Sequence, residues 1–407
     1  MANNNKHTGP NVPALRFPEF SGEWEYKSLG EIGESLIGLT YSPSDVVKEG
    51  GTIVFRSSNI QDGVIDYGDL VRVSKKIKDS IITRDGDLLI CARNGSTRLI
   101  GKNALLKKSD EGQTFGAFMM VFRSIDNRFV HQLLSTKAYS TQVSENLGAR
   151  INQITTRNFA EYTFGMPQTS EEKEKIGTFL ELINDRIETQ SKIIEELKTL
   201  RGALNESLYC CCESYQELSF NDVGVSYSGL SGKSGNDFGS GYPFIPYTNI
   251  FTNNIIDEGK LEYVQVREDE SQNSVFFGDL LMTLSSETPE EVGIGAVYLG
   301  HESPLYLNSF AFGIHITRTD LVYPPYLSWL VSTKSFRKFI LPYAQGSTRY
   351  NLQKTDFMKA KYRFPTLRRQ KAISELLLGY SSKIENEERV LNKYTALKQG
   401  LIEQLFI

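Results

Sequence analysis

The chain has 407 residues, of which 40% are hydrophobic and 23% are charged, and its formal net charge is −4. This composition is typical of a soluble protein of two or three domains and argues against a protein that coats nucleic acid unselectively. No stretch approaches the ~18 apolar residues of a membrane span, and the N-terminal sequence has no signal pattern, so we expect a cytoplasmic protein that contacts no membrane.

The first half of the chain is followed by a second copy of itself. Five pairs of blocks occur in the same order in the two halves: WEYKSLGEIG (24–33) with YQELSFNDVG (215–224), VFRSSNI (54–60) with FIPYTNI (244–250), DGDLLI (85–90) with FGDLLM (277–282), QTFGAFMMVFR (113–123) with NSFAFGIHITR (308–318), and GARINQITTRNF (148–159) with GSTRYNLQKTDF (346–357). Because the order is kept and the spacing drifts slowly, we predict two copies of a unit of about 190 residues.

The predicted elements follow this repeat in chain order. A tail, 1–20, precedes a first domain, 21–165, whose short apolar runs are broken by Gly, Asn and Asp, as in strands and turns, and are followed by helical segments. A long helix is predicted within 166–212, a second mixed domain within 213–364, and a second long helix within 365–407. The predicted fold class is α+β, with two tandem mixed α/β domains separated by two long helices.

Both long helices carry the apolar stripe of a coiled coil. Spacings that alternate between four and three residues place on one face of the first helix Ile183, Ile187, Gln190, Ile194, Leu197, Arg201 and Leu204, and on one face of the second Ile384, Glu387, Leu391, Tyr394, Lys398 and Leu401. We expect the helices to pack as an antiparallel coiled coil, with Arg201 facing Glu387 and Gln190 facing Lys398. The alternative is that each helix packs on its own domain.

Basic residues gather in two places. Ten basic residues stand between residues 331 and 369 against one acid, Asp356, and the run from Arg93 to Lys108 contains five basic residues and no acid. Such stripes suit a protein that meets a polyanion at defined positions, although solvated surface charge is an equal alternative.

Several short sequences resemble catalytic motifs but lack residues that those motifs require. GLSGKSG (229–235) contains Gly-Lys-Ser, but a phosphate-binding loop needs a glycine where Tyr227 stands. In YPPY (323–326), Tyr323 stands where an amino-methylating DNA methyltransferase has Asn or Asp. The cysteines and histidines have no metal-ligand spacing, and no nucleophile elbow appears. We therefore expect no metal in this chain and no enzyme activity of its own.

The opening NVPALRFPEFSGEWEYKSLGEI and the blocks SSNIQDGVID, GDLLICARNGS and INQITTRNFAEYTFGMPQTSEEKEKIGTFLELIND carry a family resemblance. Together with the duplication, they make the chain similar to the DNA-specificity subunit of type I restriction-modification systems over essentially its whole length. The family's helices usually open with Pro-x-x-x-Glu-Gln, and this chain departs from that pattern with PQTSEEKEKI and PTLRRQKAI.

This resemblance implies a non-catalytic subunit with two target recognition domains, each reading one half of a split, asymmetric site in double-stranded DNA. It also implies two methyltransferase subunits docked on the helices and two ATP-dependent translocase-nuclease subunits, so that the chain directs both adenine methylation and restriction. S-adenosylmethionine, ATP and Mg would be bound by those partners, and no cofactor by this chain. A helix of ~38 residues, roughly 57 Å long, could span half-sites ~34 Å apart.

Two other functions stay open at this point. One is a self-contained DNA methyltransferase or nuclease, against which the missing cofactor and metal motifs argue. The other is a non-enzymatic coiled-coil adaptor, which would not need basic stripes in duplicated domains.

We predict that DNA contacts come from polar side chains in the Gly-rich turns, because Asn and Gln can pair with adenine, Arg with guanine, and Glu can accept from cytosine. The candidates for base contact are Ser57, Ser58, Asn59, Gln61, Arg93, Asn94, Ser96, Thr97 and Arg98 in the first domain, and Tyr247, Thr248, Asn249, Ser285, Ser286 and Glu287 in the second. The candidates for phosphate or sugar contact are Arg150, Asn152, Arg349, Tyr350, Asn351 and Lys354, and the predicted DNA-binding set is completed by Lys102, Ser347 and Thr348.

Overall fold

The computed structural model describes residues 11–147, 152–211 and 214–407. The chain divides into two compact units, one formed by residues 1–191 with 389–407 and the other by residues 192–388. Two long helices, α5 (Ser170–Cys210) and α11 (Leu367–Leu405), each contribute residues to both units. In the described ranges no helix combines the length and the apolar character needed to cross a membrane.

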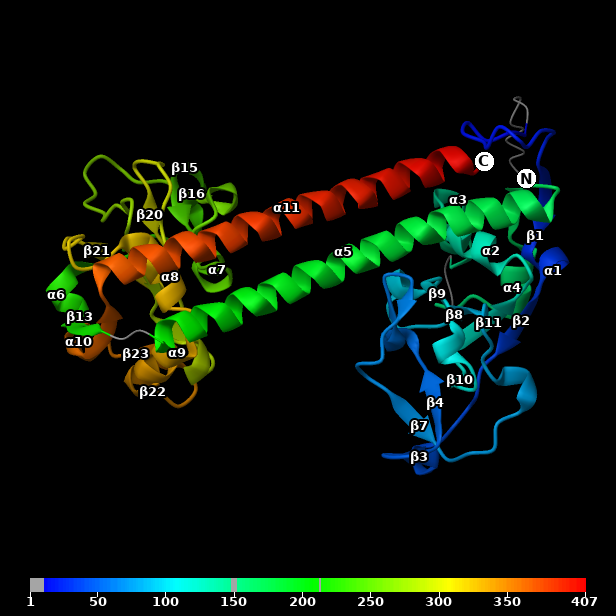
Figure 1. Ribbon diagram of the computed structural model, residues 1–407, viewed down its shortest axis with the longest axis horizontal. Helices are drawn as coiled ribbons and strands as arrows, with labels where there is room; N and C mark the ends of the chain where they lie inside the picture. The colour runs from blue at the N-terminus through cyan, green and yellow to red at the C-terminus, as the bar shows by residue number, and fades with distance from the viewer. Residues whose placement is uncertain (1–10, 148–151, 212–213) are drawn as a thin grey trace. The chain divides into compact units, whose positions relative to one another are not determined.

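The first unit holds the elements coloured blue to cyan-green in Figure 1. Its strands are β1 (Glu25–Ser28), β2 (Glu34–Ile37), β3 (Val46–Val47), β4 (Thr52–Phe55), β5 (Ile60–Gln61), β6 (Val64–Ile65), β7 (Val71–Val73), β8 (Leu88–Cys91), β9 (Asn103–Leu105), β10 (Thr114–Phe115), β11 (Met119–Arg123) and β12 (Thr163–Met166). Its short helices are α1 (Leu29–Ile32), α2 (Asn127–Leu133), α3 (Lys137–Asn146) and α4 (Thr156–Glu161).

The second unit contains a corresponding set of elements. Its strands are β13 (Tyr215–Ser219), β14 (Gly224–Ser228), β15 (Phe238–Ile245), β16 (Glu262–Val264), β17 (Leu280–Thr283), β18 (Ser285–Ser286), β19 (Gly295–Val297), β20 (Tyr306–Leu307), β21 (Ala311–Ile316), β22 (Ala344–Gly346), β23 (Tyr350–Leu352) and β24 (Lys361–Pro365). Its short helices are α6 (Phe220–Val223), α7 (Tyr247–Thr252), α8 (Pro324–Leu330), α9 (Lys334–Ile340) and α10 (Lys354–Lys359).

The two units share one topology, which confirms the predicted duplication. The sheet order β2-β11-β8-β9 in the first unit is matched by β14-β21-β17-β19 in the second. The antiparallel pair of β1 with β12 is matched by β13 with β24, and the parallel pair of β4 with β10 by β15 with β20. Each unit is therefore closed by a strand just before its long helix that pairs with its first strand.

One block of the predicted alignment between the copies is wrong by three residues. The sequence pattern pairs 113–123 with 308–318, an offset of 195. In the structure Met119 pairs with Cys91 and Ala311 pairs with Thr283, at the same place in the two sheets. The true offset here is therefore 192, which makes Phe118 the equivalent of Phe310.

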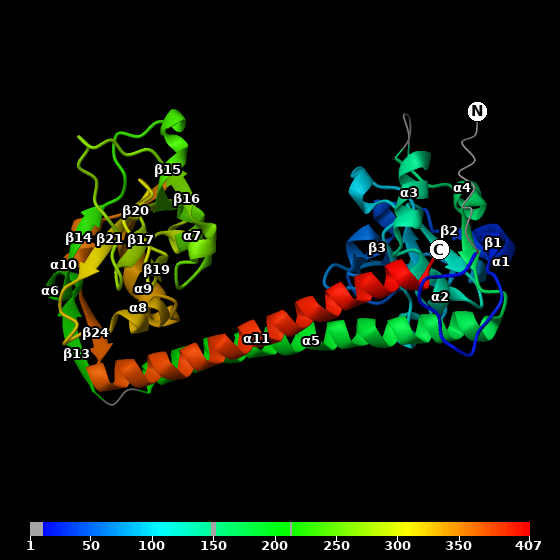
Figure 2. The same ribbon diagram turned by 90° about the horizontal axis from the view of Figure 1, so that it is seen from above.

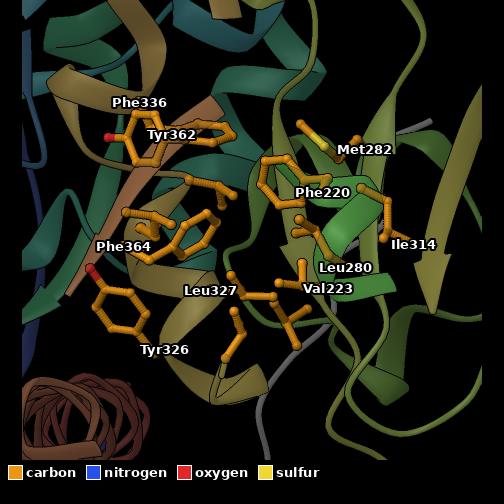
Figure 3. Close-up of a cluster of buried hydrophobic side chains, with 14 of the residues drawn as sticks. Phe220, Val223, Leu280, Met282, Ile314, Tyr326, Leu327, Phe336, Tyr362 and Phe364 are labelled. Atoms are coloured by element: carbon orange, nitrogen blue, oxygen red, sulfur yellow. The ribbon is translucent and has the colours of Figure 1, made fainter. Parts of the chain in front are cut away.

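The continuous apolar runs of the central strands are explained by burial on both faces of the sheet. Successive side chains of a strand point to opposite faces, so Leu88 and Ile90 enter one core of the first unit while Leu89 and Cys91 enter another. In the second unit the central strand contributes Leu280 and Met282 to the core drawn in Figure 3, where Phe220, Tyr326 and Phe364 also pack.

Within each unit, α5 and α11 lie side by side and run in opposite directions (Figures 1 and 2). In the first unit the guanidinium of Arg186 lies over the ring of Tyr394, 5.5 Å from its centre. In the second unit Lys198 pairs with Glu388 at 3.0 Å. The expected antiparallel packing is therefore present.

Arg201 tests the predicted register of the two helices. Its Nη1 donates to Ser381 Oγ at 2.8 Å, and burial lowers its pKa while the charge of Glu388 raises it. Arg201 thus contacts Ser381 and lies near Glu388. Its predicted partner is Glu387, the residue before Glu388. The pairing of Gln190 with Lys398 stays a prediction.

The ends of the helices also enter the cores of the domains. Ile176 and Leu180 at the start of α5 share the core of the first unit with Ile402 and Leu405 at the end of α11. The alternative in which each helix packs only on its own domain is therefore wrong, because each helix is shared between the two cores.

Residues 11–24 cross the ends of both long helices in the first unit. The Leu15 N–H donates to the Gln404 carbonyl at 2.9 Å. The buried Glu172 accepts from Arg16 at 2.7 and 2.8 Å and from Trp24 Nε1 at 3.2 Å. The described part of the predicted tail is therefore fixed to the helices and not a free extension.

Candidate nucleic-acid interface

In the first unit, three loops that are far apart in the sequence meet beside the central sheet. Ser57 lies in a short 3-10 turn after β4, and its Oγ accepts from Asn94 Nδ2 at 3.0 Å. Asn94, in the loop after β8, also accepts from the Ser96 N–H at 3.0 Å. The turn after β4 and the loop after β8 are thus joined through one amide side chain.

The segment that leads to the long helix joins the same place. Arg93 forms an isolated antiparallel bridge with Gln153, and the Ile154 N–H donates to the Ala92 carbonyl at 2.8 Å. Asn152 Nδ2 lies 3.5 Å from the Gly95 carbonyl, a long contact. These contacts place Arg93, Asn94 and Asn152 in one cluster, while Arg150 lies outside the described residues.

Five further candidates of the first unit lie close to these loops in the sequence. Ser58, Thr97 and Arg98 are exposed, and Lys102 Nζ lies 3.4 Å from Gln61 Oε1. Ser58, Gln61, Thr97 and Arg98 are therefore accessible to a ligand, whereas Lys102 is half-buried.

In the second unit the candidates meet on a small three-stranded sheet of β18, β23 and β22. Ser285 pairs with Asn351, and Ser286 pairs with Tyr350. The hydroxyl of Tyr247, at the start of α7, donates to the Ser285 carbonyl at 3.0 Å. The three loops of this unit are thus brought together in the same way as those of the first.

Exposed candidates surround this small sheet. Thr248, Glu287, Ser347, Thr348 and Arg349 are all exposed.

Arg337 on α9 positions the loop that follows Glu287. Its guanidinium donates to the carbonyls of Glu290, Val292 and Gly293 at 2.7 to 2.9 Å. Burial lowers the pKa of Arg337. We infer a positioning role for this residue, which in the sequence is one of the ten basic residues between 331 and 369.

Four predicted base contacts are corrected by the structure. Asn59 and Asn249 are buried, and each amide side chain hydrogen-bonds main-chain groups of the turn that follows it. Ser285 and Ser286 are buried in β18, where the Ser286 hydroxyl donates to Glu291 at 2.7 Å. Their side chains are committed inside the protein, so we do not retain these four as base contacts.

Lys354 is also less free than the sequence suggested. It is half-buried at the start of α10, with Nζ 5.2 Å from the ring centre of the buried Phe312. Burial lowers the pKa of Lys354. A phosphate contact from this residue remains a prediction.

Sequence reasoning missed one exposed aromatic side chain in each cluster. The Arg93 guanidinium lies over the ring of Phe118, 5.1 Å from its centre, and that of Arg349 lies over Phe310 at 5.4 Å. Phe118 is followed by four apolar residues that are all buried, so no alternation in the sequence indicates that it points outward.

A cleft of about 1280 Å³ lies within the first unit between the domain and the long helices, and Gln61, Thr97, Arg98 and Lys102 form part of its wall. Its volume exceeds the ~300–1,000 Å³ of a usual small-molecule site. Its wall mixes charges of both signs, and Lys107 is paired with Asp185 and Glu188 at 3.7 Å each. His131 lies at this cleft, and burial lowers its pKa to about 4, so it is neutral near pH 7.

The cleft therefore gives little support to a small-molecule site. In the described part of the chain, no group of three or more His, Cys, Asp or Glu side chains is placed to hold a metal ion. The two loop clusters remain the best candidates for a functional surface.

Comparison with known proteins gives consistent matches. The profile of the family described as type I restriction modification DNA specificity domain matches residues 21–199. The chain is 25% identical to the specificity subunit of the type I restriction enzyme EcoKI of Escherichia coli strain K12, aligned over 415 positions that cover 94% of this chain and 88% of the relative. It is 27% identical over 192 residues to the StySPI specificity subunit of Salmonella potsdam, covering 44% of this chain and 41% of the relative.

A solved structure gives a match over nearly the whole chain. The S subunit of a type I restriction-modification system from M. genitalium is similar with a TM-score of 0.57 and 15% identity, covering 97% of this chain and 99% of that one. At this identity the match shows a shared fold.

Proposed function

The chain belongs to the family of type I restriction-modification DNA-specificity subunits, and from that premise we propose that it is the DNA-reading subunit of such a complex. It would bind double-stranded DNA through the two loop clusters and determine the DNA sequence at which the complex acts. Partner subunits would carry out adenine methylation and restriction. S-adenosylmethionine, ATP and Mg would be bound by those partners.

The observation that carries this proposal is that each unit gathers three separated loops into one polar cluster. In the first unit these loops carry Ser57, Asn94 and Asn152, and in the second they carry Tyr247 and Asn351. A fixed surface of adaptable hydrogen-bonding groups is what reading of base edges requires.

Differences between the two clusters support recognition of an asymmetric site. With the corrected offset of 192, Arg93 corresponds to Ser285 and Asn94 corresponds to Ser286. The first cluster thus presents Arg93 and Asn94 at positions where the second has two buried serines, so equivalent loops offer different groups. Each would read a different half of a bipartite site, and the positive charges of Arg98, Lys102 and Arg349 would add phosphate contacts.

The partners follow from family membership. We propose that two methyltransferase subunits dock on α5 and α11 and that two ATP-dependent translocase-nuclease subunits complete the complex. Binding to helices shared by both units would let one partner surface serve both recognition domains.

The proposal is tested by methyl transfer with separated and combined parts. The chain is coexpressed with the methyltransferase encoded beside it, and each protein alone and the pair are incubated with DNA and labelled S-adenosylmethionine. We expect methylation by the pair alone, at one split asymmetric motif located by sequencing the methylated positions.

Two outcomes would favour the other candidate functions. Strong methylation by the chain alone would favour a self-contained methyltransferase. Methylation by the pair without sequence preference would favour an adaptor that recruits but does not read.

A further inference from the structure

Each loop cluster exposes one phenylalanine at an equivalent position. Phe118 is 60% exposed and Phe310 is 53% exposed, although both lie directly before a central strand whose next residues are buried. Leaving a large aromatic ring in water forgoes the free energy of burying it. Such a ring at the same place in both repeats indicates a use outside the folded domain.

Both rings are held by a fixed main chain. The N–H groups of Ala92 and Arg93 each donate to the Phe118 carbonyl at 3.0 Å, and the Leu284 N–H donates to the Phe310 carbonyl at 2.9 Å. The Phe310 N–H also donates to Asn308 Oδ1 at 2.9 Å. The rings therefore extend from ordered strand ends, which makes them suitable for directional contact.

An arginine covers part of each ring, but the two arginines come from different loops. Arg93 follows β8, whereas Arg349 precedes β23, and the residue equivalent to Arg93 in the second unit is Ser285. Each unit thus has an exposed ring with a guanidinium over it, but the arginine is supplied by a different loop in each unit. The guanidinium covers one face of the ring, so the exposed part of the ring is its opposite face and its edge.

We propose that Phe118 and Phe310 stack on DNA bases, each inserting the uncovered side of its ring at an opened base step of one half-site. This inference rests on the proposed function, because it takes the two clusters to be the DNA-binding surfaces. Apolar and aromatic side chains that enter base steps, and aromatic rings that stack on bases, bind through the π-face and not through charge. The two rings would therefore add affinity without adding ionic contacts.

The test compares Phe118→Ala, Phe310→Ala and the aromatic replacements Phe118→Tyr and Phe310→Tyr. Each full-length variant is coexpressed with its methyltransferase partner, and the complex is titrated with a duplex carrying the methylated motif at several salt concentrations. We expect each alanine variant to bind about 5- to 150-fold more weakly, the range found for stacking aromatics, and each tyrosine variant to bind like wild type.

The salt dependence separates stacking from charge. Because a ring releases no counterion, the slope of log Kd against log salt stays unchanged in Phe118→Ala and Phe310→Ala, whereas Arg349→Ala lowers it by about one. Phe277→Ala is the matched control, since this ring is 57% exposed but lies at the other end of β17, stacked on His301. It should bind like wild type.

Three outcomes would overturn the inference. The first is unchanged DNA binding by both alanine variants, and the second is weaker DNA binding by the tyrosine variants as well. The third is loss of copurification with the methyltransferase in the alanine variants, which would mean that the rings contact that protein. A wild-type complex that shows no preference for the motif duplex over an unrelated duplex of equal length would instead refute the proposed function itself.

Discussion

Asp87 and Asp279 occupy equivalent positions of the two repeats and play the same part in the main chain. Asp87 accepts from the Arg84 N–H at 2.9 Å, and Asp279 accepts from the Phe276 N–H at 3.0 Å, so each closes the turn that leads into the central strand. Their side-chain partners also stand at equivalent positions but differ in kind.

In the first unit that partner is Arg123, which donates to Asp87 at 2.8 and 2.9 Å. In the second it is His315, whose Nδ1 lies 2.7 Å from Asp279, and the Tyr227 hydroxyl donates to the same carboxylate at 2.5 Å. Duplication has thus kept the turn and changed the chemistry of the pair beside it.

We expect Asp87→Asn to destabilise its unit more than Asp279→Asn. Removing one partner of a buried ion pair leaves Arg123 uncompensated and costs about 3–5 kcal/mol. Because the His315 side chain is 46% exposed and the Tyr227 hydroxyl can still donate to an Asn oxygen, the loss in the second unit should be about 1–3 kcal/mol. Equal losses would contradict this reasoning.

The measurement uses the chain's two tryptophans, Trp24 in the first unit and Trp329 in the second. In a Trp329→Phe background the fluorescence during urea unfolding reports the first unit, and in a Trp24→Phe background it reports the second. Asp320→Asn is the control, because its pair with Arg318 is exposed and its loss should change the free energy of unfolding little.

The free energy of unfolding of the second unit should depend on pH through the carboxyl group of Asp279. Burial raises the pKa of this carboxyl, although hydrogen bonds from Tyr227, the Phe276 N–H and His315 oppose the shift. Above the ordinary aspartate pKa of about 4, the unfolded chain has released a proton that the folded chain still holds. This contribution to the free energy of unfolding therefore falls as pH rises through that window and stays low above the folded pKa.

Asp279→Asn removes this titration. The wild-type minus variant difference in free energy of unfolding, followed through Trp329 from pH 4 to 7, should decrease as pH rises. A difference that grows with pH would mean that its hydrogen bonds outweigh burial.

Asn59 and Asn249 should act on stability and not on sequence choice. Replacing either by Ala leaves buried main-chain groups of the following turn without partners, which should cost about 1–3 kcal/mol in the affected unit. The exposed neighbours Ser58 and Thr248 are the matched controls, since Ala there should change DNA binding with little change in stability. A changed methylation motif in a stably folded Asn59→Ala variant would show that our correction is wrong.

The long helices and the duplication could be predicted because both are periodic properties of the sequence. The spacing of Ile183, Ile187 and Ile194 indicates a helical face without any knowledge of the partner. The repeat offset failed where periodicity disappears, since Phe118 and the four buried residues after it form a uniform apolar run that aligns equally well in several registers.

The candidate site was predictable at the level of loops but not of side chains. Asn59 and Asn94 are both polar turn residues in the sequence, yet one amide is buried under its own turn and the other joins two loops. Local sequence cannot distinguish these cases, because the carbonyls that bind Asn59 belong to Asp66 and Asp69, whose positions depend on the folded turn.

The last prediction concerns which half of the DNA site each unit reads. Arg93 and Glu287 are exposed in the clusters of the first and second unit, respectively. If Arg93 pairs with a guanine, Arg93→Ala should lose about 1–3 kcal/mol of discrimination at one base and relax only one half of the motif. Glu287→Gln should relax a position in the other half, since a neutral amide no longer favours a cytosine amino group to the same extent.

Sequencing the methylated positions after reaction with each variant complex checks this directly, because every relaxed base appears as a new methylated sequence. Lys102→Ala serves as the comparison: if this residue contacts phosphate, it weakens binding to all sequences equally, lowers the salt slope by about one, and leaves the motif unchanged. Relaxation of both halves by Arg93→Ala alone would contradict a separate reading by the two units. It would indicate that the loop supports binding as a whole and does not specify a base.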